Sequence, residues 1–249
     1  MTTSDPVTAV RHVVVLAPMP LEMHAIATAF GLQRTSDAEG APWAGQVGHS
    51  SVTAIHIGMG PALTRAAATR LFERRAGDGV PVDHVMIAGI CGGLHRELEV
   101  GTLVNPETIV EYSTGAVYHH SPPGNAPQSG KLLTTEGATL DHDLSRQLGA
   151  DGYLGVDMES SAVAEVCEAK GCAWSVYRCI GDRYFDGLLD ARIVAATNPD
   201  GSGNMAEIMR LIETEPELTA KLEQLSRDSG LAARLAAEAA VRGCLALDG

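Results

Sequence analysis

Four acidic residues each follow a short apolar segment that is typical of a buried β-strand. They are Glu22, Asp157, Glu159 and Asp182. A carboxyl group can donate or accept a proton during a reaction, and a carboxylate can accept hydrogen bonds from neighbouring hydroxyl groups. Because open α/β sheets bind ligands at the carboxyl ends of their strands, we expect these residues to meet at one ligand site.

Each of these residues also has a simple structural interpretation. Glu22 fits the first turn of a helix, where the helix dipole favours an acid, and Asp157 fits a helix N-cap. Asp182 can cap a loop, and the nearby Arg178 can be a buried ion-pair partner. The joint placement of the four acids at strand ends favours a functional site over four separate structural roles.

Alternating strand and helix patterns must position these residues. The β-branched segment 12–17 predicts a strand that stops at Pro18 and Pro20, and the apolar spacing after it predicts a helix that ends at Gly31. Further strands are expected at 52–57, 83–88, within 100–112, and at 131–134, 153–156 and 174–180. Further helices are expected from 61 to about 75, at 141–148 and at 158–170. This alternation, with few aromatic residues, is typical of an α/β protein.

The domain organisation that we expect is simple. Residues 1–11 form an N-terminal tail, and residues 12–249 form one domain whose segment from about 204 to 249 is helical. Three helices are predicted in that segment, at 205–213, 216–226 and 230–245.

Two glycine-rich segments are candidates for ligand contacts. Gly58-Met59-Gly60 resembles the start of a dinucleotide-binding fingerprint, but Leu63 stands where the third glycine is required, so a nicotinamide-dependent oxidoreductase ranks last. The run 89–93 is either a loop whose backbone amides approach a ligand or a tight turn.

Charge and composition exclude several classes of protein. A formal net charge of −13 and the lack of a basic stripe argue against nucleic acid as a partner. The five cysteines form no C-x-x-C pair, so we expect reduced thiols and no metal site. With no apolar run of transmembrane length and no signal segment, we expect no membrane association and a cytoplasmic location.

At the acidic residues the sequence resembles the nucleoside phosphorylase and nucleosidase superfamily, and its motif pattern is closest to 5′-methylthioadenosine/S-adenosylhomocysteine nucleosidases. The resemblance runs from about residue 12 to 187. Its four stretches are Val13 to Glu22, Gly58-Met59-Gly60, Gly89 to Leu94 with Val100-Gly101, and Val156-Asp157-Met158-Glu159-Ser160 followed by Arg178 to Asp182. It implies a single-domain, three-layer α/β/α phosphorylase-like fold with a mixed central sheet and a helical C-terminal tail.

The resemblance also implies roles for individual residues. Glu159 would hold the ribose hydroxyls with Met158 against the sugar, and Asp182 would act as a general acid that directs a proton to N7 of a purine. Glu22 would activate the attacking water, and Arg178 would tune Asp182. The remaining expected substrate contacts are Asp157, Ile90, Gly92, Met19 and Phe185, with Met19 and Phe185 either lining an apolar pocket or packing in the core.

The same scaffold carries out hydrolysis and phosphorolysis, and two residues favour hydrolysis. Phosphorylases of this kind bring Arg and Ser or Thr to a phosphate, whereas Ile87 and Ile90 occupy those positions here. A buried phosphate without a cation or hydroxyl is costly. Charge from Arg65, Arg96 or a neighbouring subunit leaves a phosphate-dependent purine nucleoside phosphorylase open as an alternative.

Departures from the nucleosidase pattern leave the substrate open. Ile90 replaces the usual Ser or Thr, Gly181 replaces the Ser before the catalytic Asp, and segment 134–139 lacks the aromatic that stacks on adenine. Futalosine-type compounds and adenosyl lipids are therefore alternatives to methylthioadenosine, and a non-catalytic nucleoside-binding protein is an alternative to an enzyme. We expect a small-molecule purine nucleoside as ligand, no cofactor, and a homo-oligomer, most simply a two-fold dimer.

Overall fold

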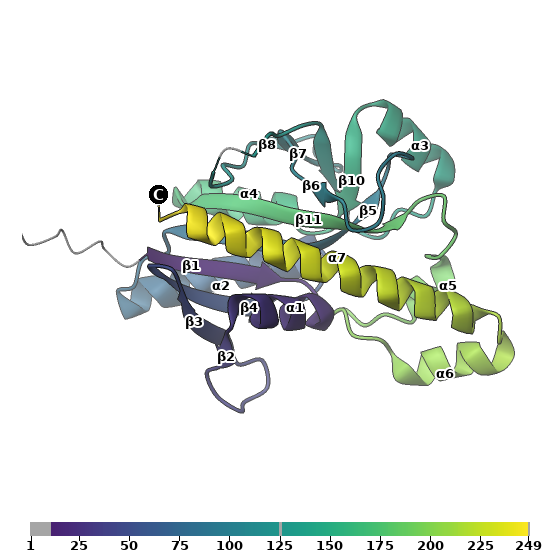
Figure 1. The fold of residues 1–249 in the computed structure, drawn as a ribbon, viewed down its shortest axis with the longest axis horizontal. Coiled ribbons are helices and arrows are strands. Elements are labelled where there is room, and N and C mark those ends of the chain that lie inside the picture. Colours follow the sequence, from purple (N-terminus) through teal and green to yellow (C-terminus); the bar gives the residue numbers. More distant parts are fainter. Residues whose placement is uncertain (1–10, 125, 249) are drawn as a thin grey trace, which may run out of the picture.

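The computed structural model describes residues 11–124 and 126–248 (Figure 1). The expected N-terminal tail, residues 1–11, lies outside the described residues except for Arg11. Among the described helices, none combines the length and the apolar character needed to cross a membrane.

Eleven strands within the described residues form one mixed sheet. They are β1 (Arg11–Ala17), β2 (Gln33–Arg34), β3 (Trp43–Val47), β4 (Ser50–His56), β5 (His84–Gly93), β6 (Leu103–Val104), β7 (Thr108–Glu111), β8 (Val117–Tyr118), β9 (Lys131–Thr134), β10 (Tyr153–Asp157) and β11 (Ala173–Arg183). The order β2-β3-β4-β1-β5-β10-β9-β7-β8 runs across the sheet, and β11 pairs with β5 and β6. Strands β1, β4, β5 and β11 are parallel, whereas β10 runs antiparallel to the last residues of β5.

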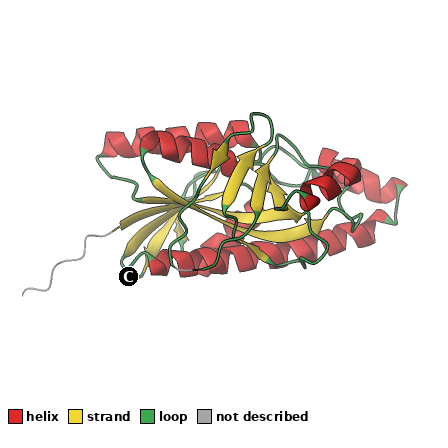
Figure 2. Cartoon of the chain, turned by 90° about the horizontal axis from the view of Figure 1, so that it is seen from above, coloured by secondary structure: helices red, strands yellow, loops and turns green. Residues whose placement is uncertain are grey.

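Helices cover both faces of the sheet (Figure 2). They are α1 (Pro20–Phe30), α2 (Pro61–Asp78), α3 (His142–Ala150), α4 (Ser160–Lys170), α5 (Ala191–Ala195), α6 (Met205–Thr214) and α7 (Leu218–Ala246). Helices α1 and α7 pack on one face and α2 and α4 on the other. This arrangement confirms the expected three-layer α/β/α fold with a mixed sheet.

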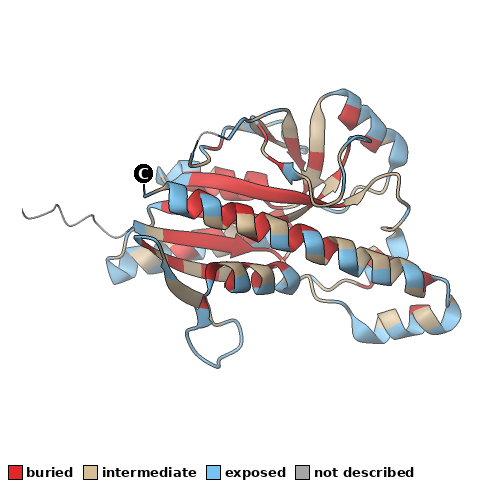
Figure 3. Ribbon diagram, in the orientation of Figure 1, coloured by how far each residue is buried: buried red, intermediate tan, exposed pale blue. Residues whose placement is uncertain are grey.

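The core follows the two-residue period of the strands. Val13 and Val15 of β1 pack with α1 and α7, whereas Val14 and Leu16 pack with α2 and α4. All four side chains are at most 1% exposed, which explains why β1 reads as a continuous apolar run rather than an alternating one. The buried strands appear in red between the helices in Figure 3.

The predicted break between the last two helices was wrong. The tail contains two helices, α6 and α7, because the predicted helices at 216–226 and 230–245 are parts of one helix of 29 residues. Gly230 lies inside this helix. A glycine inside a helix lowers its stability by only about 1 kcal/mol, and packing offsets that cost here. Ala232, Ala236 and Ala240 of α7 are buried. The short strands β2, β3 and β8 and helix α5 were not expected at all.

Candidate functional site

A cavity of about 400 Å³ opens where β1, β10 and β11 end, beside the last residues of β5. This volume lies in the range of small-molecule sites. Its lining includes Met19, Glu22, Ile90, Gly92, Asp157, Met158, Glu159 and Asp182. The structure therefore brings together eight of the ten residues that the sequence singled out. The other two, Arg178 and Phe185, lie outside the lining.

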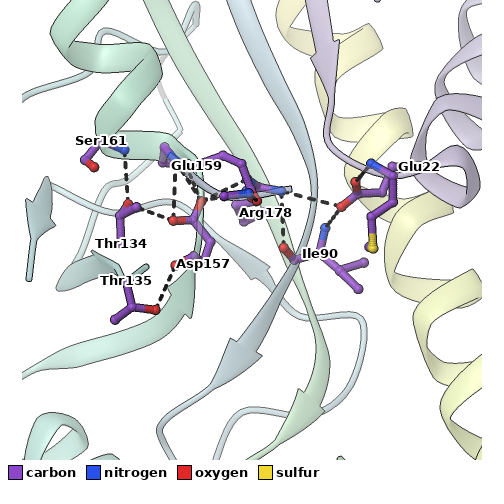
Figure 4. A network of polar contacts seen from close by, with 11 residues as sticks. Glu22, Ile90, Thr134, Thr135, Asp157, Glu159, Ser161 and Arg178 are labelled. Atoms are coloured by element: carbon purple, nitrogen blue, oxygen red, sulfur yellow. Dashed lines mark hydrogen bonds and ion pairs between the residues drawn. The ribbon is translucent and has the colours of Figure 1, made fainter. Parts of the chain in front are cut away.

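Arg178 is buried beneath the cavity and joins three of the acids (Figure 4). It projects from β11, and its Nε donates a hydrogen bond of 2.9 Å to Asp157. Its terminal nitrogens lie 2.8 Å from Glu159 and 3.5 Å from Glu22. One guanidinium thus contacts carboxylates from α1, from β10 and from the turn that precedes α4. The interpretation of Arg178 as a buried ion-pair partner is confirmed.

Glu22 lies in the first turn of α1, and its carboxylate is held from two directions. One oxygen accepts hydrogen bonds from the backbone N–H of Ile90 at 2.7 Å and from Arg178, and the other accepts from the N–H of Met19 at 2.8 Å. The bond to Met19 also satisfies an N–H group at the start of the helix. These contacts fix a carboxylate that is only 1% exposed at the wall of the cavity.

Asp157 and Glu159 occupy the turn between β10 and α4. Asp157 accepts hydrogen bonds from the hydroxyl of Thr134 at 2.7 Å, from the hydroxyl and N–H of Ser160, and from Arg178. These contacts tie Asp157 to the first residue of α4, but the N-cap of this helix is Glu159, so the N-cap interpretation of Asp157 was wrong. Glu159 accepts a hydrogen bond of 2.8 Å from the N–H of Gly60, so the Gly58-Met59-Gly60 segment binds a carboxylate of the protein.

The expected glycine loop at 89–93 was wrong, because these residues continue strand β5. The small size of Gly89 provides space for the network of Arg178. A Cβ atom on Gly89 would lie 2.0 Å from a Glu22 oxygen and 2.7 Å from Arg178. Glycine at position 89 is therefore required for the contact between Glu22 and Arg178.

Asp182 lies apart from the network of Arg178, so the prediction that Arg178 tunes Asp182 was wrong. Arg178 pairs with Gly89 across the sheet, and the register then shifts between Ile180 and Asp182, which pairs with Gly92. The shift is a β-bulge, which redirects the side chains that follow it. Asp182 consequently faces the cavity while Arg178 stays with the other acids.

Burial changes the proton affinity of Glu22, Asp182 and Glu159. Removal from water raises the pKa of Glu22 to about 7, although Arg178 opposes the rise. Removal from water also raises the pKa of Asp182 to about 6, with a further contribution from Asp186. The pKa of Glu159 is raised for the same main reason. Two carboxyl groups that exchange protons near neutral pH therefore face one cavity.

Burial alone would lower the pKa of Arg178. The carboxylates of Asp157, Glu159 and Glu22 outweigh that effect, so its pKa lies above the ordinary value. The guanidinium therefore remains charged and holds the three acids together.

A segment after β11 closes the cavity, and no sequence pattern predicted it. Its lining residues are Leu189, Ile193, Val194, Thr197, Gly201 and Gly203. The Nε2–H of His56 donates to the carbonyls of Pro18 at 3.2 Å and Asp200 at 2.8 Å, which fastens this segment to the loop before α1. The N–H of Met59 adds a bond of 2.9 Å to the carbonyl of Pro199.

The aromatic residue in the cavity wall is Tyr184, whereas Phe185 was expected there. The ring of Phe185 lies 4.9 Å from the guanidinium groups of both Arg96 and Arg183, outside the lining. Tyr184 packs edge-on against Phe185. Because neighbouring residues after a strand point in different directions, the spacing alone did not distinguish the two rings.

Comparisons with known proteins agree with the fold. The family model of the phosphorylase superfamily matches residues 12–152, which is more than half of the chain. A comparison with curated proteins gives no significant match.

Solved structures of nucleosidases share the fold. A 5′-methylthioadenosine/S-adenosylhomocysteine nucleosidase from Helicobacter pylori is 16% identical with a TM-score of 0.67, covering 95% of this chain and 99% of that one. The corresponding enzyme from Neisseria meningitidis, in complex with methylthio-immucillin-A, is 13% identical with a TM-score of 0.68 and the same coverage. The futalosine hydrolase of Helicobacter pylori is 15% identical with a TM-score of 0.66, covering 96% and 98% of the two chains. With the match of the family model, the chain belongs to the phosphorylase superfamily.

Proposed function

We propose that the protein hydrolyses the N-glycosidic bond of a purine nucleoside. The observation that carries this proposal is the pair of carboxyl groups, Glu22 and Asp182, whose pKa values are raised to about 7 and about 6 at two places along one cavity. Cleavage of a glycosidic bond through an oxocarbenium-like transition state needs an acid on the leaving group and a base on water. The likeness to nucleosidase structures supports the same reaction.

In this proposal each acid has one role. Asp182 donates its proton to N7 of the purine as the bond between the base and the sugar breaks, so that the base leaves as a neutral molecule. Glu22 accepts a proton from the water that attacks the anomeric carbon. Glu159 anchors the ribose, since each carboxylate oxygen keeps a free lone pair beside its bond to Gly60 or Arg178.

Water is favoured over phosphate as the nucleophile. Of the described residues that line the cavity, none is Lys, Arg or His. Ile87 is buried in the core, and Ile90 offers its side chain to the cavity while its N–H binds Glu22. Arg65 pairs with Glu165 on α4, and Arg96 lies over Phe185. A phosphate dianion would therefore meet carboxylates without a compensating cation.

The substrate that we propose is a methylthioadenosine-like or S-adenosylhomocysteine-like nucleoside. Leu189, Ile193 and Val194 in the closing segment provide apolar contacts for a group on the 5′ carbon. Futalosine-type compounds remain in the tested set because the futalosine hydrolase shares the fold to a similar degree. The proposal also includes a homodimer and a cytoplasmic location, both of which the sequence favours.

Base release from a panel of nucleosides tests the proposal. The panel contains methylthioadenosine, S-adenosylhomocysteine, adenosine, inosine and futalosine, each assayed with and without phosphate. We expect free base and free sugar without phosphate. A sugar 1-phosphate formed only when phosphate is present would replace hydrolysis by phosphorolysis. No release in either buffer would favour the non-catalytic binding protein.

The pH dependence of kcat/KM follows from the two raised pKa values. Glu22 must be ionised to accept a proton from water, and Asp182 must be protonated to donate one. Since the base has the higher pKa, the active form is a minor species, and kcat/KM is expected to rise up to about pH 6 and to fall above about pH 7. Initial rates at low substrate concentration measure this profile. A profile that does not fall below about pH 6 or above about pH 7 would contradict the assigned roles.

A further inference from the structure

The hydroxyl of Ser145 on α3 is an unexplained polar group in the cavity wall. The residue is 1% exposed, it lines the cavity, and its Oγ has no hydrogen-bond partner among the described residues. Buried hydroxyl groups are normally paired, because burial removes the hydrogen bonds that water would supply. A bound ligand is the natural partner for such a group in a cavity wall.

Helix α3 is held rigidly against the cavity. Gly149, one turn beyond Ser145, packs so closely that a Cβ atom there would lie 2.3 Å from the carbonyl oxygen of Leu94. On the preceding turn, the ring of His142 packs edge-on against Tyr184 with 6.3 Å between centroids. These three residues of α3 are spaced to share one face of the helix, so the face that carries Ser145 is fixed at both ends.

The position of Ser145 relative to the acids follows from strand β5. Glu22 binds the N–H of Ile90, Asp182 lies opposite Gly92, and α3 contacts Leu94, the residue after the strand. Successive residues of a strand advance by about 3.3 Å. Glu22, Asp182 and the hydroxyl of Ser145 are therefore reached in this order along the cavity. A nucleoside whose sugar lies near Glu22 and whose N7 meets Asp182 would extend its base towards α3.

We propose that Ser145 is a specificity-determining residue that binds the polar group at C6 of the purine. This proposal rests on the proposed function and extends it to recognition of the base. C6 is the ring position next to the carbon that bears N7, so its substituent lies on the edge that Asp182 approaches. A hydroxyl can both donate and accept, and it therefore pairs with either a 6-amino or a 6-oxo group. Unsubstituted purine offers no such partner.

Titration with free bases tests the proposal without requiring catalysis. Adenine, hypoxanthine and unsubstituted purine are titrated into wild-type protein and into Ser145→Ala by calorimetry. The substitution is expected to weaken binding of the tighter of adenine and hypoxanthine by about five- to tenfold, the effect of losing one hydrogen bond, and to leave unsubstituted purine unchanged. Alanine is a stronger helix former than serine, so α3 is expected to persist.

Ser50→Ala is the matched control, because Ser50 is equally buried in β4 and lies outside the cavity lining. Its affinities are expected to equal those of the wild type. Equal effects of Ser145→Ala on all three bases, no effect on any of them, or no binding of any base to the wild type would overturn the proposal. The nucleoside panel separates the proposed hydrolysis from the proposed role of Ser145. If the panel shows no base release, hydrolysis is contradicted, whereas the titrations with free bases still test the role of Ser145.

Discussion

Replacing Asp182 with asparagine is expected to lower the turnover number by about two to four orders of magnitude, the usual contribution of a positioned general acid. The amide keeps the shape of the side chain but is not acidic enough to transfer a proton to the leaving base. Turnover is measured as base release at saturating concentration of the nucleoside that the panel identifies. Because the acid acts in bond breaking, the loss is expected in kcat more than in KM.

Stability provides a second measurement on the same variant. Burial raises the pKa of Asp182 from 3.8 to about 6, so ionisation of this group opposes folding as the pH rises through that range. Asparagine removes that cost, and above pH 6 the variant is expected to be at least as stable as the wild type. Asp83→Asn, at the opposite end of β5, serves as a control and should keep normal turnover. Wild-type turnover in Asp182→Asn would exclude Asp182 as the proton donor.

Replacing Arg178 with methionine is expected to lower the free energy of unfolding by about 3–5 kcal/mol near neutral pH, as found when one partner of a buried ion pair is removed. The three carboxylates of Glu22, Asp157 and Glu159 would lose their only contact with a cation among the described residues. Methionine fills similar space without a charge, so the loss reports electrostatics rather than a cavity. Urea unfolding followed by circular dichroism measures it.

The loss is expected to depend on pH in a defined direction. Without the guanidinium, Glu22 and Glu159 relieve their repulsion by binding protons, so their pKa values in the folded state rise further above the unfolded values. The folded state then binds more protons than the unfolded state, and the variant gains stability relative to the wild type as the pH falls. A difference in stability that is the same in acid and in mild base would contradict this account.

Two further variants delimit the role of Arg178. Arg178→Lys keeps the charge but cannot reproduce the forked contacts, and an intermediate loss is expected. Arg65→Met removes an ion pair with Glu165 whose side chains are 39% and 45% exposed, and solvent screening keeps the expected loss below about 1 kcal/mol. If Arg178→Met proved as mild as Arg65→Met, the buried network would not stabilise the fold.

Much of the fold could be predicted because its signals are local. The apolar run of β1 and the glycine after α1 are short-range features whose physical effect does not depend on distant residues. The boundaries failed where packing overrides propensity. Gly89 to Gly93 extend a strand because neighbouring strands pair with them, and Gly230 lies inside α7 because that helix packs along the sheet.

The site was predicted in part for the same reason. Residues near strand ends were recognised from sequence, and the rule that such ends share one edge of a sheet placed them in one cavity. Ser145 was missed because an unpaired hydroxyl has no signature in sequence. The bulge after Ile180 was missed as well, and it decides that Asp182 faces the cavity while Arg178 faces the other acids.

The sequence by itself determined the α/β class, most of the strands and helices, and the acids available for chemistry. Only the tertiary structure decided how those acids differ. Glu22 and Arg178 are 156 positions apart, and their contact, like the raised pKa values of Glu22 and Asp182, exists only when distant segments pack and exclude water. The apolar patterns and turn residues that mark strands and helices lie within short stretches of chain, whereas burial and charge pairing are properties of the folded molecule.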